Sequence, residues 1–203
     1  MAAVRTYGGV GAADREAERR ARLLAAGLDL LGTGGLQAAT VRKVCEAARL
    51  TPRYFYESFP DIDALTGAVF DAVVDEMVAR GHAALAAAPA DPRGRVRAAL
   101  GSVIALLGDD PRKGRVVLAL ALASPPLAAR RLAAGRRIAG LVGERLGAGV
   151  TARQREFAAR FLVGAFAETL TAWLDDPAPD DALLDDCTEL FLAVAAAARG
   201  LTP

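Results

Sequence analysis

Cysteine, histidine and long apolar runs are all scarce in this chain of 203 residues. Its two cysteines, Cys45 and Cys187, lie far apart and no secretory signal precedes them, so we expect reduced, apolar thiols rather than a disulfide framework. The longest uninterrupted apolar run, Val116–Ala123, is far shorter than the roughly 20 residues that a membrane span needs. These absences predict a cytoplasmic protein with no membrane partner.

The sequence patterns that support enzyme or metal chemistry are also missing. There is no Gly-rich phosphate loop, no HExxH motif, and no Ser or Cys nucleophile at a recognisable spacing from a histidine. Asp75 and Glu76 precede His82 by one to two helical turns, but a metal site wants at least three convergent ligands, so we interpret His82 as a solvated side chain. We predict no catalytic residues, no metal and no cofactor.

Charge is balanced over the whole chain but unevenly distributed along it. Residues 1–60 contain nine Arg or Lys against six Asp or Glu, so the rest of the chain is slightly acidic. Nucleic-acid affinity depends on where cations face phosphates, and a local excess of this kind is compatible with DNA binding. A solvated charged face would produce the same excess.

Helical periodicity dominates and no segment shows convincing strand alternation, so we predict an all-α fold. The first helix should cover about 14–31 and end at Gly34 and Gly35; a second, 41–48, should be capped by Thr40, and a third should begin after Thr51 and Pro52. Prolines mark the breaks between six further helices, expected at about 62–88, 93–108, 111–123, 126–147, 152–174 and 181–199.

The second and third helices, separated by a turn of about three residues, have the layout of a helix-turn-helix, whose second member lies in the major groove of DNA. The outward face of this member carries Arg53, Tyr54 and Tyr56. Aromatic side chains usually seek cover, so two tyrosines exposed beside an arginine indicate a recognition surface. The alternative is that Tyr54 covers neighbouring hydrophobic surface.

This segment resembles the helix-turn-helix signature of the TetR family, both in TVRKVCEAARLTPRYFYESFPDIDAL (40–65) and in the preceding RLLAAGLDLLGTGGLQAAT (22–40). The resemblance implies an N-terminal helix-turn-helix domain followed by a larger helical domain for ligand binding and dimerisation. The implied boundaries are a flexible arm at 1–13, a DNA-binding domain at 14–61 and an effector-binding and dimerisation domain at 62–203. The implied DNA contacts are Thr40 and Tyr56 to phosphate, and Arg42, Thr51, Arg53 and Tyr54 to bases or backbone.

Three positions depart from the family pattern. Arg49 replaces the usual turn glycine, which requires either a residue held at positive φ, at a cost of about 1 kcal/mol, or a different path of the turn. Ser58 stands where a longer His or Tyr often reaches phosphate, and Ile62 stands where the family has a lysine. These departures weaken the implied list of contacts but not the prediction of DNA binding.

The last two predicted helices carry stripes suited to close packing, and the stripe on 181–199 repeats with spacing 3, 4, 3, 4. Packing within one chain would give the same pattern. In the TetR family the final two helices of each subunit pair into a four-helix interface, so the resemblance favours a homodimer held by Leu162, Ala165, Thr169, Leu184, Cys187, Phe191, Val194 and Ala198.

The resemblance also implies a pocket for a small apolar effector in the helical body. Aromatic residues of the penultimate helix are candidates for its lining, although aromatics at helical spacing are more often core: Phe157, Phe161, Phe166 and Trp173. The predicted function is a ligand-released repressor that binds a pseudo-palindromic operator. Two alternatives stay open: an all-α enzyme or apolar-ligand carrier, and a DNA-binding protein that senses no ligand.

Overall fold

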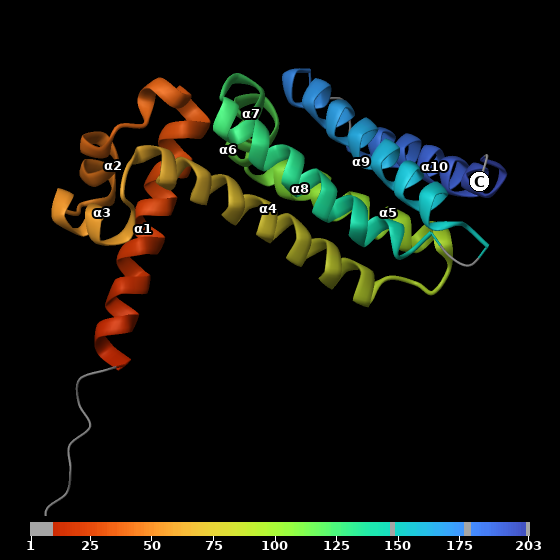
Figure 1. Cartoon of the computed structure of the whole chain (residues 1–203), viewed down its shortest axis with the longest axis horizontal. Coiled ribbons are helices and arrows are strands. Elements are labelled where there is room, and N and C mark those ends of the chain that lie inside the picture. Colours follow the sequence, from red (N-terminus) through yellow and green to blue (C-terminus); the bar gives the residue numbers. More distant parts are fainter. Residues whose placement is uncertain (1–9, 147–148, 177–179, 202–203) are drawn as a thin grey trace, which may run out of the picture. The chain divides into compact units, whose positions relative to one another are not determined.

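The computed structural model describes residues 10–146, 149–176 and 180–201, and within these ranges it contains helices and no strand (Figure 1). This confirms the all-α prediction. The chain forms two compact units that divide between Val69 and Phe70, inside one continuous helix. We describe them separately as the N-terminal and C-terminal units.

The N-terminal unit contains α1 (Val10–Gly34), a short 3-10 turn (Leu36–Ala38), α2 (Val41–Ala48), α3 (Pro52–Ser58) and the first turns of α4 (Ile62–Ala87). Of the predicted arm, residues 10–13 belong to α1, and residues 1–9 lie outside the described ranges. α1 ends as predicted, because Gly35 takes a positive φ of 71° and donates its N–H to the Leu31 carbonyl.

The core of the N-terminal unit forms where α1, α2 and α3 pack together and where α1 meets the start of α4. Gly27 of α1 permits a close approach to α4, since a Cβ at this position would lie 3.0 Å from a methyl of Val69. The largest fully buried side chains here come from all four helices: Leu23, Leu31, Val44, Phe55, Leu65 and Val69. The sequence thus places α2 and α3 on a rigid base.

The C-terminal unit contains the rest of α4, α5 (Pro92–Asp109), α6 (Pro111–Gly114), a π-helical stretch (Arg115–Leu120), α7 (Ala121–Ala123), α8 (Pro125–Gly143), α9 (Ala152–Asp175), α10 (Asp180–Ala197) and a final 3-10 turn (Ala198–Gly200). α8 packs against α9, and α10 packs against α5 and α9 (Figure 1). Two helices differ from the prediction. The helix expected at 111–123 is interrupted by the π-helical stretch, and the helix expected at 126–147 ends earlier, at Gly143.

Capping residues fix where several of these helices begin. Prolines stand at the first turn of α5 and α8, as predicted. Asp91 accepts a 2.8 Å hydrogen bond from the Gly94 N–H at the start of α5. Thr151 and Gln154 cap α9 reciprocally in a capping box. α9 also has the length and mean hydropathy of a membrane span, which is weak evidence, because helices of soluble proteins reach the same values.

Candidate nucleic-acid interface and cavity

α3 is anchored so that one face points inward and the other remains free. Phe55 and Phe59, one turn apart, are both buried, with ring centroids 5.9 Å apart. Pro52 begins the helix, and Thr51 occupies the N-cap without a side-chain cap hydrogen bond. The Thr51 hydroxyl is therefore not used by the helix that it precedes.

All six residues predicted to contact DNA lie on α2, α3 or their N-caps, and all are exposed. Tyr56 is 59% exposed and Tyr54 37% exposed. The Thr40 hydroxyl accepts a hydrogen bond from the Lys43 N–H at 3.3 Å, which leaves its own proton free to be donated. The structure thus brings together, on one small module, Thr40, Arg42, Thr51, Arg53, Tyr54 and Tyr56.

Interactions within the unit already hold two of these side chains in place. Nε of Arg53 lies 3.1 Å from Oε1 of Glu57 one turn later, and Arg19 approaches the other carboxylate oxygen at 4.0 Å. The Arg19 guanidinium also lies over the Tyr54 ring, 4.7 Å from its centroid. The Arg19 guanidinium therefore covers part of the Tyr54 ring, while Tyr56 remains open.

The turn between α2 and α3 keeps the geometry expected of a glycine. Arg49 has φ 51° and ψ 46°, the left-handed conformation, so the first of the two possibilities for this turn is confirmed. The Arg22 guanidinium of α1 supports it by donating to the carbonyl oxygens of Ala48, at 2.5 Å, and Arg49, at 3.2 Å. Sequence reasoning missed this support, because nothing in the spacing connects Arg22 to the turn.

The start of α4 differs from what the family pattern implies. Asp61 accepts a 2.7 Å hydrogen bond from the Ala64 N–H, and Asp63 adds a second carboxylate in the first turn. An acidic cap occupies an amide that an incoming phosphate would use, and it repels the anion. The start of α4 beside Ile62 is therefore already capped by an acidic side chain.

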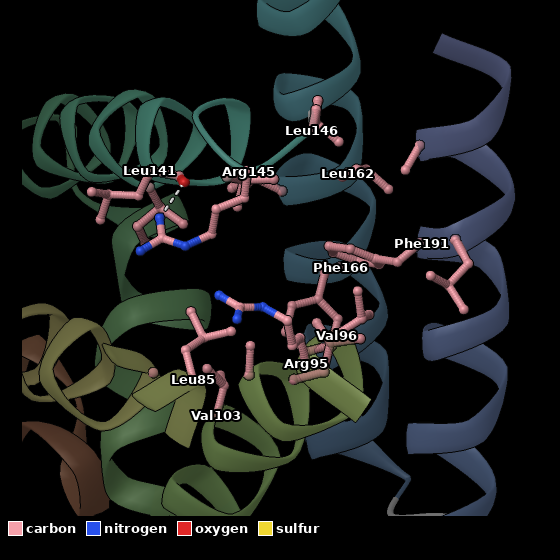
Figure 2. A pocket seen from close by; sticks show the side chains of 18 of the residues that line it. Leu85, Arg95, Val96, Val103, Leu141, Arg145, Leu146, Leu162, Phe166 and Phe191 are labelled. Atoms are coloured by element: carbon pink, nitrogen blue, oxygen red, sulfur yellow. Dashed lines mark hydrogen bonds between the residues drawn. The ribbon is translucent and has the colours of Figure 1, made fainter. Parts of the chain in front are cut away.

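The C-terminal unit encloses a cavity of about 590 Å³, a volume typical of sites for small molecules. Figure 2 shows Leu162 and Phe166 of α9 with Phe191 of α10 along one side, and Leu85 of α4 with Val103 of α5 along another. Residues of α8 and of the π-helical stretch complete the walls. Most of this lining is aliphatic or aromatic, which suits an apolar guest.

Only one of the four predicted ligand-binding aromatics lines the cavity. Phe166 does, and its ring meets Phe191 edge-on with centroids 5.8 Å apart. Trp173 is buried outside the lining. Phe157 and Phe161 are 59% and 57% exposed and also lie outside it. Most of the remaining wall residues are ordinary aliphatic side chains that carry no distinguishing sequence signal.

The stripe predicted to hold a dimer lies largely inside the C-terminal unit. Leu162 and Phe191 line the cavity, Cys187 and Ala198 are buried, and Val194 packs against a buried cluster that includes Ala198. A residue buried within one chain has almost no surface to offer a second copy. Of the eight predicted residues, two on α9 are exposed: Ala165 and Thr169.

Cys45, Cys187 and His82 do not form a catalytic or metal-binding site among the described residues. Both cysteines are buried, and this burial raises the pKa of the Cys45 and Cys187 thiols, which disfavours the reactive thiolate. His82 is exposed. Among the described residues, no three His, Cys, Asp or Glu side chains gather closely enough to hold a metal ion.

Residues 23–69 match a family model described as bacterial regulatory proteins of the tetR family. No curated protein matches the chain. Solved structures do: a transcriptional regulator from Rhodococcus sp. Rha1 aligns with a TM-score of 0.73 and 22% identity, covering 91% of this chain and 99% of that one. A tetR-family transcriptional regulator from Streptomyces coelicolor aligns with a TM-score of 0.73 and 18% identity, covering 91% and 83%.

A third structure is the fatty acid degradation regulator FadR from Bacillus halodurans, with a TM-score of 0.73 and 17% identity, covering 86% of this chain and 94% of that one. At these identities the likeness concerns the fold. The helix-turn-helix and the larger helical body therefore occur together in the same arrangement of elements as in known regulators.

Proposed function

We propose that this chain, a TetR-family regulator by the match of residues 23–69 and by its fold, is a repressor that binds a pseudo-palindromic operator as a homodimer and is released by a small molecule. The family match at the helix-turn-helix carries the DNA-binding part of this conclusion. The repressor mode, the dimer and the ligand release are our proposals.

DNA contact is assigned to the exposed face of α2 and α3. Arg42 and Arg53 supply positive charge, and Thr40 and Tyr56 supply hydroxyl donors, all on exposed positions of the helix-turn-helix. Arg53→Ala should weaken operator binding by about 1–3 kcal/mol and relax the preference at one base pair, if Arg53 reads a guanine edge. An equal loss for all sequences would make Arg53 a phosphate contact instead.

The assay is a mobility-shift titration on the DNA upstream of the protein's own gene, at several salt concentrations. Arg136→Ala, which removes an exposed arginine from α8 outside the cavity lining, is the matched control. It should leave both the affinity and the salt slope unchanged. Absence of any salt-dependent, sequence-selective binding would favour the alternative of an apolar-ligand carrier.

The homodimer is assigned to an exposed apolar face on α9 and α10. Phe157 and Phe161 stand one turn apart on α9, and Leu190 of α10 is 64% exposed. Large apolar side chains grouped on helices that pack together indicate a surface that a partner covers. A second copy of the chain fits this role because a two-fold symmetric protein matches a pseudo-palindromic operator.

Ligand release is assigned to α4. This helix begins in the N-terminal unit at Ile62 and contributes Met77, Val78 and Leu85 to the cavity lining further along. A ligand shifts the equilibrium only by its differential affinity for two states, and a release of about 100-fold corresponds to about 2.7 kcal/mol of coupling. Reciprocity provides the test: saturating operator DNA must weaken ligand binding by the same factor, as measured by calorimetry.

A further inference from the structure

The side chains with polar groups in the cavity lining all belong to basic residues. The apolar walls described above are interrupted by three arginines and one histidine, and the lining contains no Asp, Glu, Ser, Thr, Asn or Gln. These four residues are exposed and come from α4, α5, the turn after α8 and the final 3-10 turn: His82, Arg95, Arg145 and Arg199. The cavity is therefore apolar inside with a basic margin.

Not every arginine of α5 faces the cavity, because the two nearest to Arg95 pair with carboxylates of α10 instead. Arg93 pairs with Glu189 of α10, and Arg97 pairs with Asp185 of the same helix. Arg95, two residues from each, lines the cavity and has no carboxylate partner among the residues that the structure describes. One helix thus directs two arginines toward acidic partners and one toward the cavity.

Arg145 repeats this pattern on the other side of the cavity. The only hydrogen bond of its side chain among the described residues is a local one, from Nη1 to the carbonyl oxygen of Leu141 at 2.6 Å, so its charge is not neutralised. Figure 2 shows the side chains of Arg95, from α5, and Arg145, from the turn after α8, extending toward the same open part of the cavity. Like charges that converge without an acidic residue favour an anion between or beside them.

We propose that the cavity binds an amphipathic anion: an apolar chain or ring system held by the aliphatic walls, with one anionic head group paired to Arg95 and Arg145. A guanidinium forms paired, charge-assisted hydrogen bonds with carboxylate or phosphate oxygens, while a hydroxyl head accepts only a single, weaker hydrogen bond and a cationic head is repelled. Because the basic side chains are exposed, the head group lies at the opening and the apolar part points inward. This inference deepens the proposed function by naming the chemical class of the effector.

Probes of one chain length separate the contribution of the head group from that of the apolar body. Dodecanoate, dodecyl phosphate, dodecanol and dodecyltrimethylammonium are titrated into the full-length protein by calorimetry, below their micelle concentrations. The two anions should bind about 10-fold or more tightly than dodecanol, and the cation most weakly. Comparison of dodecanoate with dodecyl phosphate identifies the preferred anion. Equal binding of anion and alcohol, or no binding of any anion, overturns the inference.

Two variants make the assignment residue-specific. Arg95→Met and Arg145→Met keep most of the apolar bulk and remove the charge, so each should reduce the preference for dodecanoate over dodecanol. Arg93→Met, on the same helix but paired with Glu189, is the control and should keep the preference. A separate assay measures whether dodecanoate releases the protein from operator DNA. If dodecanoate binding depends on the two arginines but DNA affinity stays unchanged, the inference about the head group is supported and the proposal of ligand release is contradicted.

Discussion

Arg53 and Glu57 form an ion pair across one turn of α3, on the face that the helix presents to solvent. The same carboxylate also approaches Arg19 of α1. A recognition helix thus carries a negative charge beside the cation proposed to contact DNA. An exposed ion pair of this kind contributes little to stability. Its main consequence is electrostatic, because the Glu57 carboxylate opposes the approach of DNA phosphates.

Glu57→Gln should increase operator affinity, because it frees Arg53 and removes a charge that repels the DNA backbone. We expect a gain of about 2-fold to 10-fold at low salt that shrinks as salt screens the interaction. Glu46→Gln removes the same charge from exposed α2 and is the control. If both variants gain equally, only net charge matters and the local role of Glu57 is refuted.

Arg49→Gly should stabilise the N-terminal unit. The left-handed conformation costs an ordinary residue about 1–2 kcal/mol and glycine almost nothing. Glycine also makes the unfolded chain more flexible, which lowers the free energy of unfolding and offsets part of the gain. The expected increase in the free energy of unfolding is about 1 kcal/mol, measured by urea denaturation. Arg49→Ala keeps the strain while removing the charge, so an equal gain from alanine would argue against a backbone origin.

Phe161→Asp should convert the proposed homodimer to monomers. Phe161 is exposed in the single chain, so a charge there costs little folding energy but is unfavourable inside an apolar interface. Sedimentation should show the monomer, and operator affinity should fall because two linked half-sites bind more tightly than one. Leu132→Asp replaces a similarly exposed apolar residue on α8 and should leave the dimer intact. The reverse outcome would move the interface to α8.

The sequence predicts the fold well where one residue type carries a local signal. Pro111 and Pro125 at helix starts, Thr40 at its cap and Gly35 at a positive φ are each confirmed, since capping and chain reversal depend on neighbouring residues. The π-helical stretch Arg115–Leu120 carries no comparable signal.

Side-chain placement on α9 and α10 is harder to predict because these helices are apolar on more than one face. Periodicity identifies the stripe that contains Cys187 and Phe191 but does not tell whether the chain's own body or a second copy covers it. In the structure the body covers that stripe, and Phe157 and Phe161 remain exposed on another face. The family resemblance implies a pocket in the helical body, but the residues that line it could not be foreseen, because they depend on where side chains distant in sequence leave space unfilled.

Asp110 provides a pH-dependent test of how the C-terminal unit is held at the junction of α5 and α6. Arg112 donates to both of its carboxylate oxygens, from Nε at 2.8 Å and from Nη2 at 2.9 Å, and these hydrogen bonds hold the pKa of Asp110 below its ordinary value of 3.8. A carboxyl whose pKa is lowered by folding contributes stability that is present above its unfolded pKa and is lost as pH falls through its folded pKa.

Asp110→Asn retains a side chain that can cap α6 but removes the charge, so the variant isolates the ionic contribution. At pH 7 the variant should be less stable than the wild type by about 1 kcal/mol, since the pair is only partly shielded from solvent. That difference should shrink once the pH falls below 3.8, measured by urea denaturation at steps from pH 7 to pH 3. Asp109→Asn, at a more exposed carboxylate next in sequence, should show little difference at any pH. A difference for Asp110→Asn that stays constant from pH 7 to pH 3 would mean that the amide disturbs packing and that the charge contributes nothing.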